Sequence, residues 1–200
     1  MVFKKIEKLE AYKTYGTRIG TKMVNKALEG FVFKRVANKF TIFNIKLIDE
    51  RIKLAAKMLQ NYGRKDILLV CTLDAAYYPV YNFARLMKIS VNFGRYLSGS
   101  LTNLNYKNFF EPKVIVVTDP SANKRAINDA KKINIPIIGI ANTDSAVSYL
   151  DLIIPGNNKN GKSIGLILYL LAREMAVSKE EKESIDKIEL EDFVSKELEF

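Results

Sequence analysis

The sequence predicts an α/β fold in which a parallel sheet of five strands carries helices on both faces. Short apolar runs alternate along the 200-residue chain with segments of helical periodicity, which is the pattern that βαβ units produce. The apolar runs lack polar alternation, as expected for strands that are covered on both faces. We expect right-handed crossovers and a flavodoxin-like or Rossmann-like strand order.

The N-terminal part of the chain contains a basic arm followed by alternating strands and helices. Residues 1–38 contain scattered glycines and show no sustained period, so they predict an irregular arm with one short helix near Lys4–Lys13. Ile45–Tyr62 carries apolar residues at helical spacing and is followed by Gly63, a typical helix stop. Pro79 must lie in the first turn of its helix because it has no N–H to donate. The elements expected after the arm are strands at Phe40–Phe43, Ile67–Cys71 and Ile89–Phe93, and helices at Ile45–Tyr62 and Ala75–Met87.

The C-terminal part continues the alternation after a long loop. Residues 94–113 have no clear period, and a loop of this length inside a compact domain is usually functional. The chain therefore divides into a basic arm (1–38), an α/β domain (39–178) and an acidic extension (179–200). The extension has four apolar residues for a weak amphipathic helix, Ile185, Ile188, Phe193 and Val194. The elements expected between loop and extension are strands at Val114–Thr118, Ile135–Ala141 and Leu152–Ile154, and helices at Ser121–Ile133 and Gly161–Ala176.

The charge of the chain is unevenly distributed. Lys and Arg number 32 and Asp and Glu 22, which gives a formal net charge of +10. Residues 179–200 contain 4 Lys and 9 acidic residues and so carry −5, which leaves +15 on residues 1–178. Residues 1–65 contain 16 basic and 5 acidic residues and hold +11 of this excess. A concentrated basic excess indicates a polyanionic partner, most often nucleic acid.

Composition also excludes several classes of chemistry. The chain has no His and one Cys, which removes His-dependent catalysis, His-ligated metals and zinc fingers. Cys71 lies in an apolar run and is interpreted as a small buried hydrophobe. No apolar run approaches the ~20 residues of a membrane span, and the N-terminus lacks a signal-peptide core, so we expect an intracellular, soluble protein. Asp119, Asp144 and Asp151 follow or flank strand ends, where they can cap turns or bind a metal or ribose, and we favour capping.

The segment Gly156–Ser163 matches the P-loop pattern of nucleotide-binding proteins at every fixed position and lies between a strand and a helix. In a P-loop, backbone N–H groups cradle the phosphates, Lys162 would reach the terminal phosphates, and Ser163 would bind Mg²⁺. The motif comes late in the chain, after four strands, and no apolar strand ending in Asp follows it. As a helix N-terminus with polar and basic side chains, the same segment also fits an RNA backbone. Both interpretations stay open at this point.

Two further segments combine aromatic and basic side chains. In residues 94–103, Tyr96 could stack on a base and Arg95 could hold a phosphate, or the loop could pack with its aromatic side chains inside. In the arm, Tyr12 and Tyr15 are interspersed with Lys and Arg residues, which suits single-stranded or folded RNA.

Several segments, taken together and in order, resemble the signatures of one family. They are Tyr15–Lys22, Asn92–Asn103, Glu111–Pro120, Ile135–Asp144, Val147–Ser163 and Tyr169–Glu174. The family is the second ("S-two") family of small-subunit ribosomal proteins, in its archaeal and eukaryotic branch, which is related to the laminin-receptor precursor. The resemblance covers about residues 10–178. It departs at Arg18, where the family commonly has His, and at Ser98 and Ser100.

The resemblance implies a flavodoxin-like domain seated on small-subunit rRNA between head and body, beside neighbouring ribosomal proteins. The implied role is structural and concerns assembly and translation in the cytoplasm, without catalysis, cofactor, metal, membrane or small-molecule substrate. The corresponding family loop lacks the glycines of the nucleotide motif, so Gly156 and Gly161 look like chance completions of that pattern. We expect the acidic extension to be mobile or to pack on a neighbouring ribosomal protein.

We therefore predict a structural rRNA-binding protein whose basic arm becomes ordered on RNA. The alternatives are a P-loop NTPase that uses Gly156–Ser163 and a protein-interaction module whose arm docks on an acidic protein. The predicted RNA contacts are Lys13, Arg18, Lys22, Lys26, Lys34, Arg35, Arg95, Tyr96, Thr102, Asn103, Asn157, Asn158, Lys159, Lys162 and Ser163.

Overall fold

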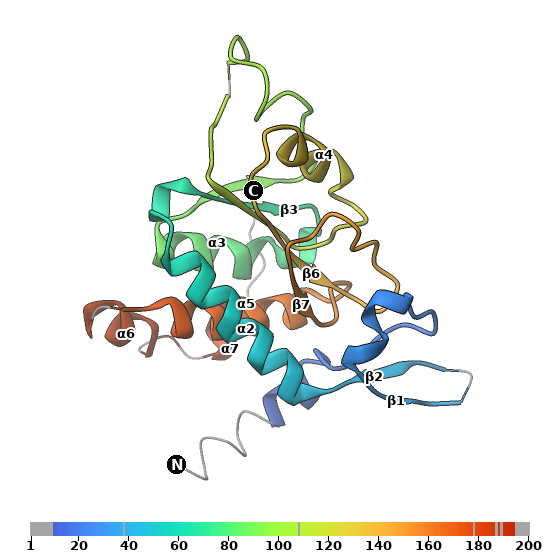
Figure 1. Ribbon diagram of the computed structural model, residues 1–200. Coiled ribbons are helices and arrows are strands. Elements are labelled where there is room, and N and C mark those ends of the chain that lie inside the picture. The colour runs from blue at the N-terminus through green and yellow to red at the C-terminus, as the bar shows by residue number, and fades with distance from the viewer. Residues whose placement is uncertain are drawn as a thin grey trace.

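The computed structural model describes residues 10–194 apart from 38, 108, 178, 187 and 189. Figure 1 shows a sheet with helices on both faces and a two-stranded hairpin that projects from one side. The strands are β1 (Val32–Arg35), β2 (Thr41–Phe43), β3 (Ile67–Cys71), β4 (Ser90–Phe93), β5 (Val114–Val117), β6 (Ile137–Ala141) and β7 (Leu152–Pro155). The helices are α2 (Ile45–Gln60), α3 (Tyr77–Met87), α4 (Lys124–Lys132), α5 (Gly161–Met175), α6 (Lys179–Asp186) and α7 (Leu190–Val194). Short 3-10 helices are η1 (Lys26–Phe31), η2 (Arg64–Asp66) and η3 (Asp74–Ala76).

Strands β3 to β7 form one parallel sheet in the order β4-β3-β5-β6-β7. Numbered along the chain from β3, this is the order 2-1-3-4-5, the flavodoxin-like one of the two predicted orders. Leu69 of β3 pairs with Val91 of β4 on one side and with Val116 of β5 on the other. The chain leaves β3 toward β4 and later returns to the opposite side of β3, so the loops after β3 and β5 diverge at the carboxyl edge.

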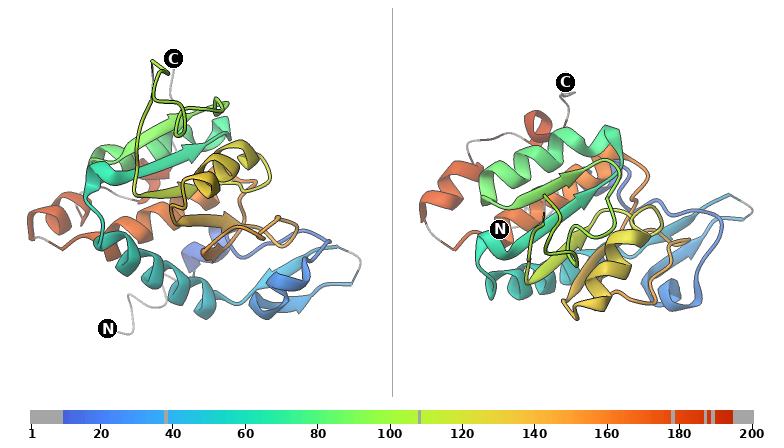
Figure 2. Two further views of the ribbon diagram at one scale, coloured as in Figure 1. Left: turned by 45° about the horizontal axis from the view of Figure 1, so that its top comes forward. Right: turned by 90° about the horizontal axis from the view of Figure 1, so that it is seen from above.

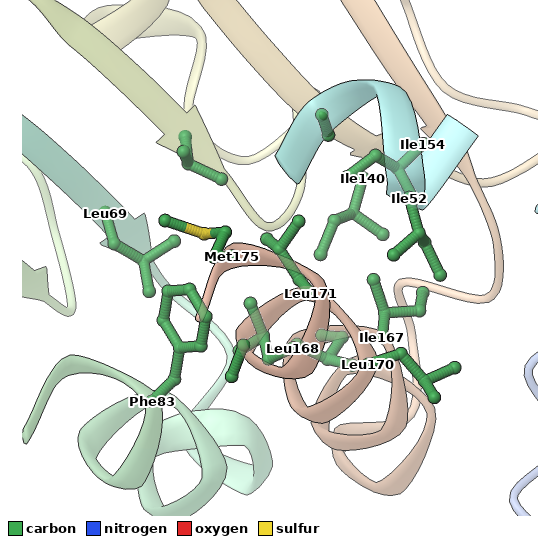
Figure 3. Close-up of a cluster of buried hydrophobic side chains, with 14 of the residues drawn as sticks. Ile52, Leu69, Phe83, Ile140, Ile154, Ile167, Leu168, Leu170, Leu171 and Met175 are labelled. Atoms are coloured by element: carbon green, nitrogen blue, oxygen red, sulfur yellow. The ribbon is translucent and has the colours of Figure 1, made fainter. Parts of the chain in front are cut away.

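The larger core lies between the sheet and helices α2, α3 and α5. The predicted apolar face of α5 is confirmed, and most of its side chains are buried. In Figure 3, Leu171 and Met175 of α5 point toward Ile140 and Leu69 of the sheet. Helices α2 and α3 pack against the two sides of α5 and close the core. Burying this one helix therefore holds three helices and the sheet together.

The second core lies on the opposite face of the sheet, beneath α4 and the loop of residues 94–113 (Figure 2). Helix α4 begins at Lys124, later than predicted, because Asp119 Oδ1 accepts the Ser121 N–H (2.9 Å) and residues 120–122 form a turn. The loop places Tyr96 and Leu101 in this core, with exposed fractions of 3% and 2%. On this face the loop thus takes the place of a second helix.

The described part of the arm is folded. Residues 10–14 are helical, and most of the helix predicted near Lys4–Lys13 lies outside the described residues. Strand β1 pairs antiparallel with β2, and Ile42 of β2 also bridges Ile19. Tyr12 is 1% exposed and belongs to the larger core. The described part of the arm is therefore more ordered than its lack of a sequence period suggests, because pairing between distant backbone segments leaves no local period.

The acidic extension packs on the domain. Helices α6 and α7 lie against α3 and α5, and Ile185, Phe193 and Val194 are buried. The ring of Phe193 meets the ring of Tyr169 edge-on with centroids 5.4 Å apart, and Asn82 Nδ2 donates to the Phe193 carbonyl (3.2 Å). Two short helices stand where one weak amphipathic helix was expected, and Ile188 lies outside both of them. The described residues of the extension pack without a neighbouring protein. No helix in the described ranges has the length and apolar character needed to span a membrane.

Candidate nucleic-acid interface

The arm is held against the carboxyl edge of the sheet by hydrogen bonds to the loops after β6 and β7. The Thr21 N–H donates to Thr143 Oγ1 (2.9 Å), and the Asn25 N–H donates to the Thr143 carbonyl (2.7 Å). The Asn157 N–H donates to the Thr17 carbonyl (3.0 Å). Because backbone atoms make one or both ends of each bond, the two loops position the arm's main chain and not only its side chains.

Gly20 makes this close approach possible. A Cβ at residue 20 would lie 2.4 Å from Thr41 Oγ1 and 2.6 Å from Thr143 Cγ2. Thr41 is buried, and its Oγ1 donates to the Thr21 carbonyl (3.0 Å). Glycine therefore lets the arm, β2 and the loop after β6 meet at one point, which gives the Gly-Thr pair at residues 20–21 a structural reason.

The predicted cations of the arm lie at its surface. Arg35 forms an ion pair with Glu29 Oε1 at 2.7 Å, and both side chains are more than half exposed, at 60% and 52%. Solvent screens such a pair, so the guanidinium remains available to a phosphate. Within the described residues of the arm, the exposed cations are Lys13, Lys22, Lys26, Lys34 and Arg35, and Arg18 is half-buried.

The hairpin β1–β2 presents aromatic side chains that the sequence analysis missed. Phe33 is 72% exposed and Phe40 is 36% exposed. Tyr12, one of the two arm tyrosines that the sequence predicts to suit RNA, lies in the core, where burial and then the charge of Asp49 raise its pKa. Tyr15 is half-buried. The sequence feature that could have indicated the exposed Phe33 is the run of residues 33–35, in which a phenylalanine stands beside a lysine and an arginine.

The loop after β7 contains asparagines that bind its own backbone. Asn157 Oδ1 accepts the Lys159 N–H (3.0 Å), and Asn160 Oδ1 accepts the Lys162 N–H (3.0 Å) as the N-cap of α5. The loop therefore has a fixed shape before any ligand arrives. Of its predicted contacts, Lys159 and Lys162 are exposed, Asn157 is half-buried, and Asn158 and Ser163 are buried.

The same loop does not have the geometry of a nucleotide P-loop. A Cβ at Gly161 would lie 2.0 Å from the Ala75 carbonyl oxygen, and a Cβ at Gly156 would lie 2.7 Å from Ile167 Cδ1. Both glycines therefore serve close packing. Ser163 is fully buried, so its hydroxyl cannot reach a solvated Mg²⁺ unless α5 unpacks. These contacts favour the packing interpretation over the NTPase interpretation.

The loop of residues 94–113 divides between core and surface. The Tyr96 hydroxyl donates to Asp129 Oδ2 (3.2 Å), and the Gly99 N–H donates to the same oxygen (2.8 Å). Burial, and then the charge of Asp129, raises the pKa of Tyr96. The buried ring cannot stack on a base, so that role for Tyr96 is corrected to closure of the second core. The other predicted contacts of this loop, Arg95, Thr102 and Asn103, are exposed.

Two of the three aspartates at the strand ends bind backbone N–H groups, and one of these two also pairs with a lysine. Asp119 Oδ1 accepts the Ser121 N–H, and its Oδ2 lies 3.0 Å from Lys159 Nζ, which ties the loop after β7 to the loop after β5. Asp151 Oδ2 accepts the Ile137 N–H (2.8 Å). Among the described residues, no three side chains of the metal-binding types come together. The hydrogen bonds favour a structural role for these carboxylates.

Comparison with known proteins gives consistent matches. The family model of Ribosomal protein S2 matches residues 105–178. "Small ribosomal subunit protein uS2" of Saccharolobus solfataricus is 39% identical over 167 residues, which cover 84% of this chain and 72% of the relative. The protein of the same name from Staphylothermus marinus is 40% identical over 167 residues, covering 84% and 76%. That from Nanoarchaeum equitans is 39% identical over 166 residues, covering 83% of each chain.

Proposed function

Because the chain belongs to the uS2 family of small-subunit ribosomal proteins, in its archaeal branch, we propose that it is a structural constituent of the small ribosomal subunit. It binds small-subunit rRNA between head and body, beside neighbouring ribosomal proteins, and supports assembly and translation in the cytoplasm. The relatives are named as ribosomal proteins and not as enzymes, and the packed loop at Gly156–Ser163 agrees with a role without catalysis.

The observation that carries the proposal is a basic arm already folded onto the domain. The lysines in its described part are exposed, while the backbone there is hydrogen-bonded to the loops after β6 and β7. A folded arm loses less conformational entropy on binding, so more of the electrostatic free energy appears as affinity. The sequence predicts an arm that becomes ordered on RNA, whereas the described residues support binding by a preformed surface.

The proposed mechanism combines charge neutralisation with stacking. Each Lys or Arg that meets a phosphate releases condensed counterions, so affinity falls steeply with salt concentration. Phe33 and Phe40 offer apolar faces on which unpaired bases can stack. The hairpin that carries them projects from the body of the protein (Figure 2), so it can reach between RNA segments. The predicted contact residues that are buried would act by holding these surfaces in place.

The experiment compares two triple variants in binding to naked small-subunit rRNA. Both lose three exposed cations, so their net charge is the same. The arm variant carries Lys22→Gln, Lys26→Gln and Lys34→Gln. The control variant, altered in α2, η2 and α3, carries Lys57→Gln, Lys65→Gln and Arg85→Gln.

The arm variant should lose at least tenfold in affinity at about 0.1 M salt, and the slope of log K against log salt should fall by about 2–3 units, because each lost phosphate contact contributes about 0.9. The control variant should change affinity by less than about threefold, since only general electrostatic attraction is lost. Filter binding over a salt series measures both quantities. Equal losses in the two variants would show that the arm is not the RNA-binding surface.

A protein-interaction module is the second candidate, and exposed apolar side chains of the arm favour it. Met23 is 75% exposed and Phe33 is 72% exposed. Nuclease treatment of native complexes separates the two functions. Partners that leave when the RNA is destroyed support rRNA as the primary ligand, whereas partners that stay bound support direct protein contacts through the arm.

A further inference from the structure

A hollow of about 540 Å³ lies at the carboxyl edge of the sheet, at the ends of β3, β4 and the loop after β5. It occurs where the loops after β3 and β5 diverge, the switch point at which open α/β sheets bind ligands. Its volume falls in the range of about 300–1,000 Å³ that is typical of small-molecule sites. Its walls include Asp74, Tyr77, Arg95, Asn123, Lys124 and Arg125.

Basic groups at one end of the hollow suit an anion. Arg95, Lys124 and Arg125 are exposed and line it. Lys124 and Arg125 are also the first residues of the nine-residue helix α4, whose N-cap Asn123 makes no side-chain cap hydrogen bond. Unbonded N–H groups and the helix dipole at such an end favour a negative ligand. A phosphate group satisfies both the cations and the helix terminus.

Asn123 indicates a second group on the ligand. Its side chain is 1% exposed and lines the hollow. Nδ2 donates to the Asp119 carbonyl (2.9 Å) and to Thr72 Oγ1 (3.3 Å), which fixes the orientation of the amide. Oδ1 has no hydrogen-bond partner among the described residues. An unpaired buried acceptor is unfavourable, so a ligand hydroxyl or amino group that donates to it would be bound selectively.

Tyr77 supplies an aromatic wall. Its ring meets Phe93 edge-on with centroids 5.1 Å apart, which holds it in position. Burial, and then a hydrogen bond to Asp74, raises the pKa of Tyr77 to about 12, so the hydroxyl stays neutral at physiological pH. A neutral aromatic ring in a polar hollow is a surface against which a base or a ribose can pack.

We infer that this hollow takes one nucleotide, with its phosphate at the start of α4 and a donor group of its ribose or base at Asn123 Oδ1. A nucleotide contains a phosphate, hydrogen-bond donor groups and a planar base in one molecule. Inorganic phosphate contains only the first of these three. The nucleotide can be one residue of an RNA chain or a free mononucleotide. The inference that the nucleotide belongs to rRNA rests on the proposed function. The inference that the hollow binds a nucleotide does not depend on that function.

The experiment titrates the ¹⁵N-labelled full-length protein with AMP, adenosine and inorganic phosphate. AMP should shift the amide signals of Gly94 and residues 121–125 saturably. Adenosine and inorganic phosphate should each bind at least tenfold more weakly, because each lacks one of the recognised groups. Arg125→Glu should weaken AMP binding at least tenfold. Arg85→Glu, the same charge change at the far end of α3, should alter it less than twofold.

Three results would overturn the inference. They are shifts at these amides that do not saturate, equal effects of Arg125→Glu and Arg85→Glu, and inorganic phosphate that binds as tightly as AMP. Both substituted arginines are exposed, so neither variant is expected to unfold the protein. Matching amide spectra of the two variants away from residues 85 and 125 check this directly.

The rRNA-binding assay then identifies the source of the nucleotide. If Arg125→Glu weakens rRNA binding at least fivefold and AMP competes with rRNA, the ligand is a nucleotide of the RNA chain. If AMP binds but rRNA binding is unchanged, the ligand is a free mononucleotide. Either result supports the site. Failure of the proposed function would appear separately, as equal rRNA binding by the arm variant and its control.

Discussion

Gly161 shows how strongly one missing atom can constrain a loop. Gly161→Ala would place a Cβ 2.0 Å from the Ala75 carbonyl oxygen, a backbone atom that cannot rotate away. We expect the free energy of unfolding to fall by about 2–3 kcal/mol, the cost of overpacking a rigid site. Urea denaturation measures the loss.

Gly30→Ala is the matched control, because a Cβ there would meet no atom within 4 Å. This substitution should change the free energy of unfolding by less than about 0.5 kcal/mol. A Gly161→Ala protein as stable as the Gly30→Ala protein would remove the packing explanation for the loop and revive the nucleotide interpretation.

Charged and uncharged polar residues differ in how well sequence predicts their exposure. Lysines are almost never fully buried without a partner, so the exposure of Lys22 or Lys162 follows from residue type. Asn158 is buried because its Nδ2 reaches the carbonyl of Ile140 (3.2 Å), a partner 18 positions away that no local pattern reveals. Whether any of these side chains touches RNA stays a prediction.

At the scale of elements, the sheet is predictable because its central strands β3, β5 and β6 are buried on both faces. β3 occupies Ile67–Cys71, as predicted, since an apolar run bounded by charged and turn residues leaves little freedom in its limits. β1 was missed because its residues are mostly exposed and it is stabilised by pairing with β2. A strand that buries little leaves no apolar signature for sequence analysis to detect.

The loop of residues 94–113 yields a prediction about alkaline stability. The raised pKa of Tyr96 means that the folded state keeps its proton at a pH where the unfolded chain, with a tyrosine pKa of about 10, has lost it. The Tyr96 hydroxyl therefore makes its full contribution to the free energy of unfolding below about pH 10. This contribution is lost as the pH rises further. Tyr96→Phe should cost about 1 kcal/mol at pH 7, where one hydrogen bond to Asp129 is lost.

Above about pH 10 the difference between wild type and Tyr96→Phe should narrow by about 1 kcal/mol for each pH unit, because only the wild type has a tyrosine to ionise at this position. Unfolding midpoints in urea from pH 7 to pH 11 give the comparison. Tyr81→Phe, at an exposed position on α3, serves as the control. A constant difference across the pH range would show that Tyr96 ionises as readily in the folded state as in the unfolded chain.

At the scale of the whole molecule, the acidic helices and the basic β1–β2 hairpin lie on opposite sides. Figures 1 and 2 show α6 on the side away from the β1–β2 hairpin in every view. The exposed acids Glu183 and Glu191 lie on α6 and α7, whereas the exposed cations Lys34 and Arg35 lie on the hairpin. Such a separation orients a protein in the field of a polyanion, with the hairpin toward the RNA. The packed extension is thus placed to steer binding without lying on the proposed interface.

This arrangement predicts a salt-dependent effect of the acidic helices. Glu183→Gln with Glu191→Gln removes two exposed negative charges from α6 and α7. At about 0.01 M salt the Debye length is about 30 Å, so the association rate with rRNA should rise about two- to threefold. At 0.15 M it is about 8 Å, and the rate should stay within about 1.3-fold of wild type because screening is then much stronger. Stopped-flow mixing measures the rates, and Lys182→Gln on α6 should slow association at low salt. An increase of severalfold at 0.15 M would mean instead that the extension competes with RNA for the arm itself.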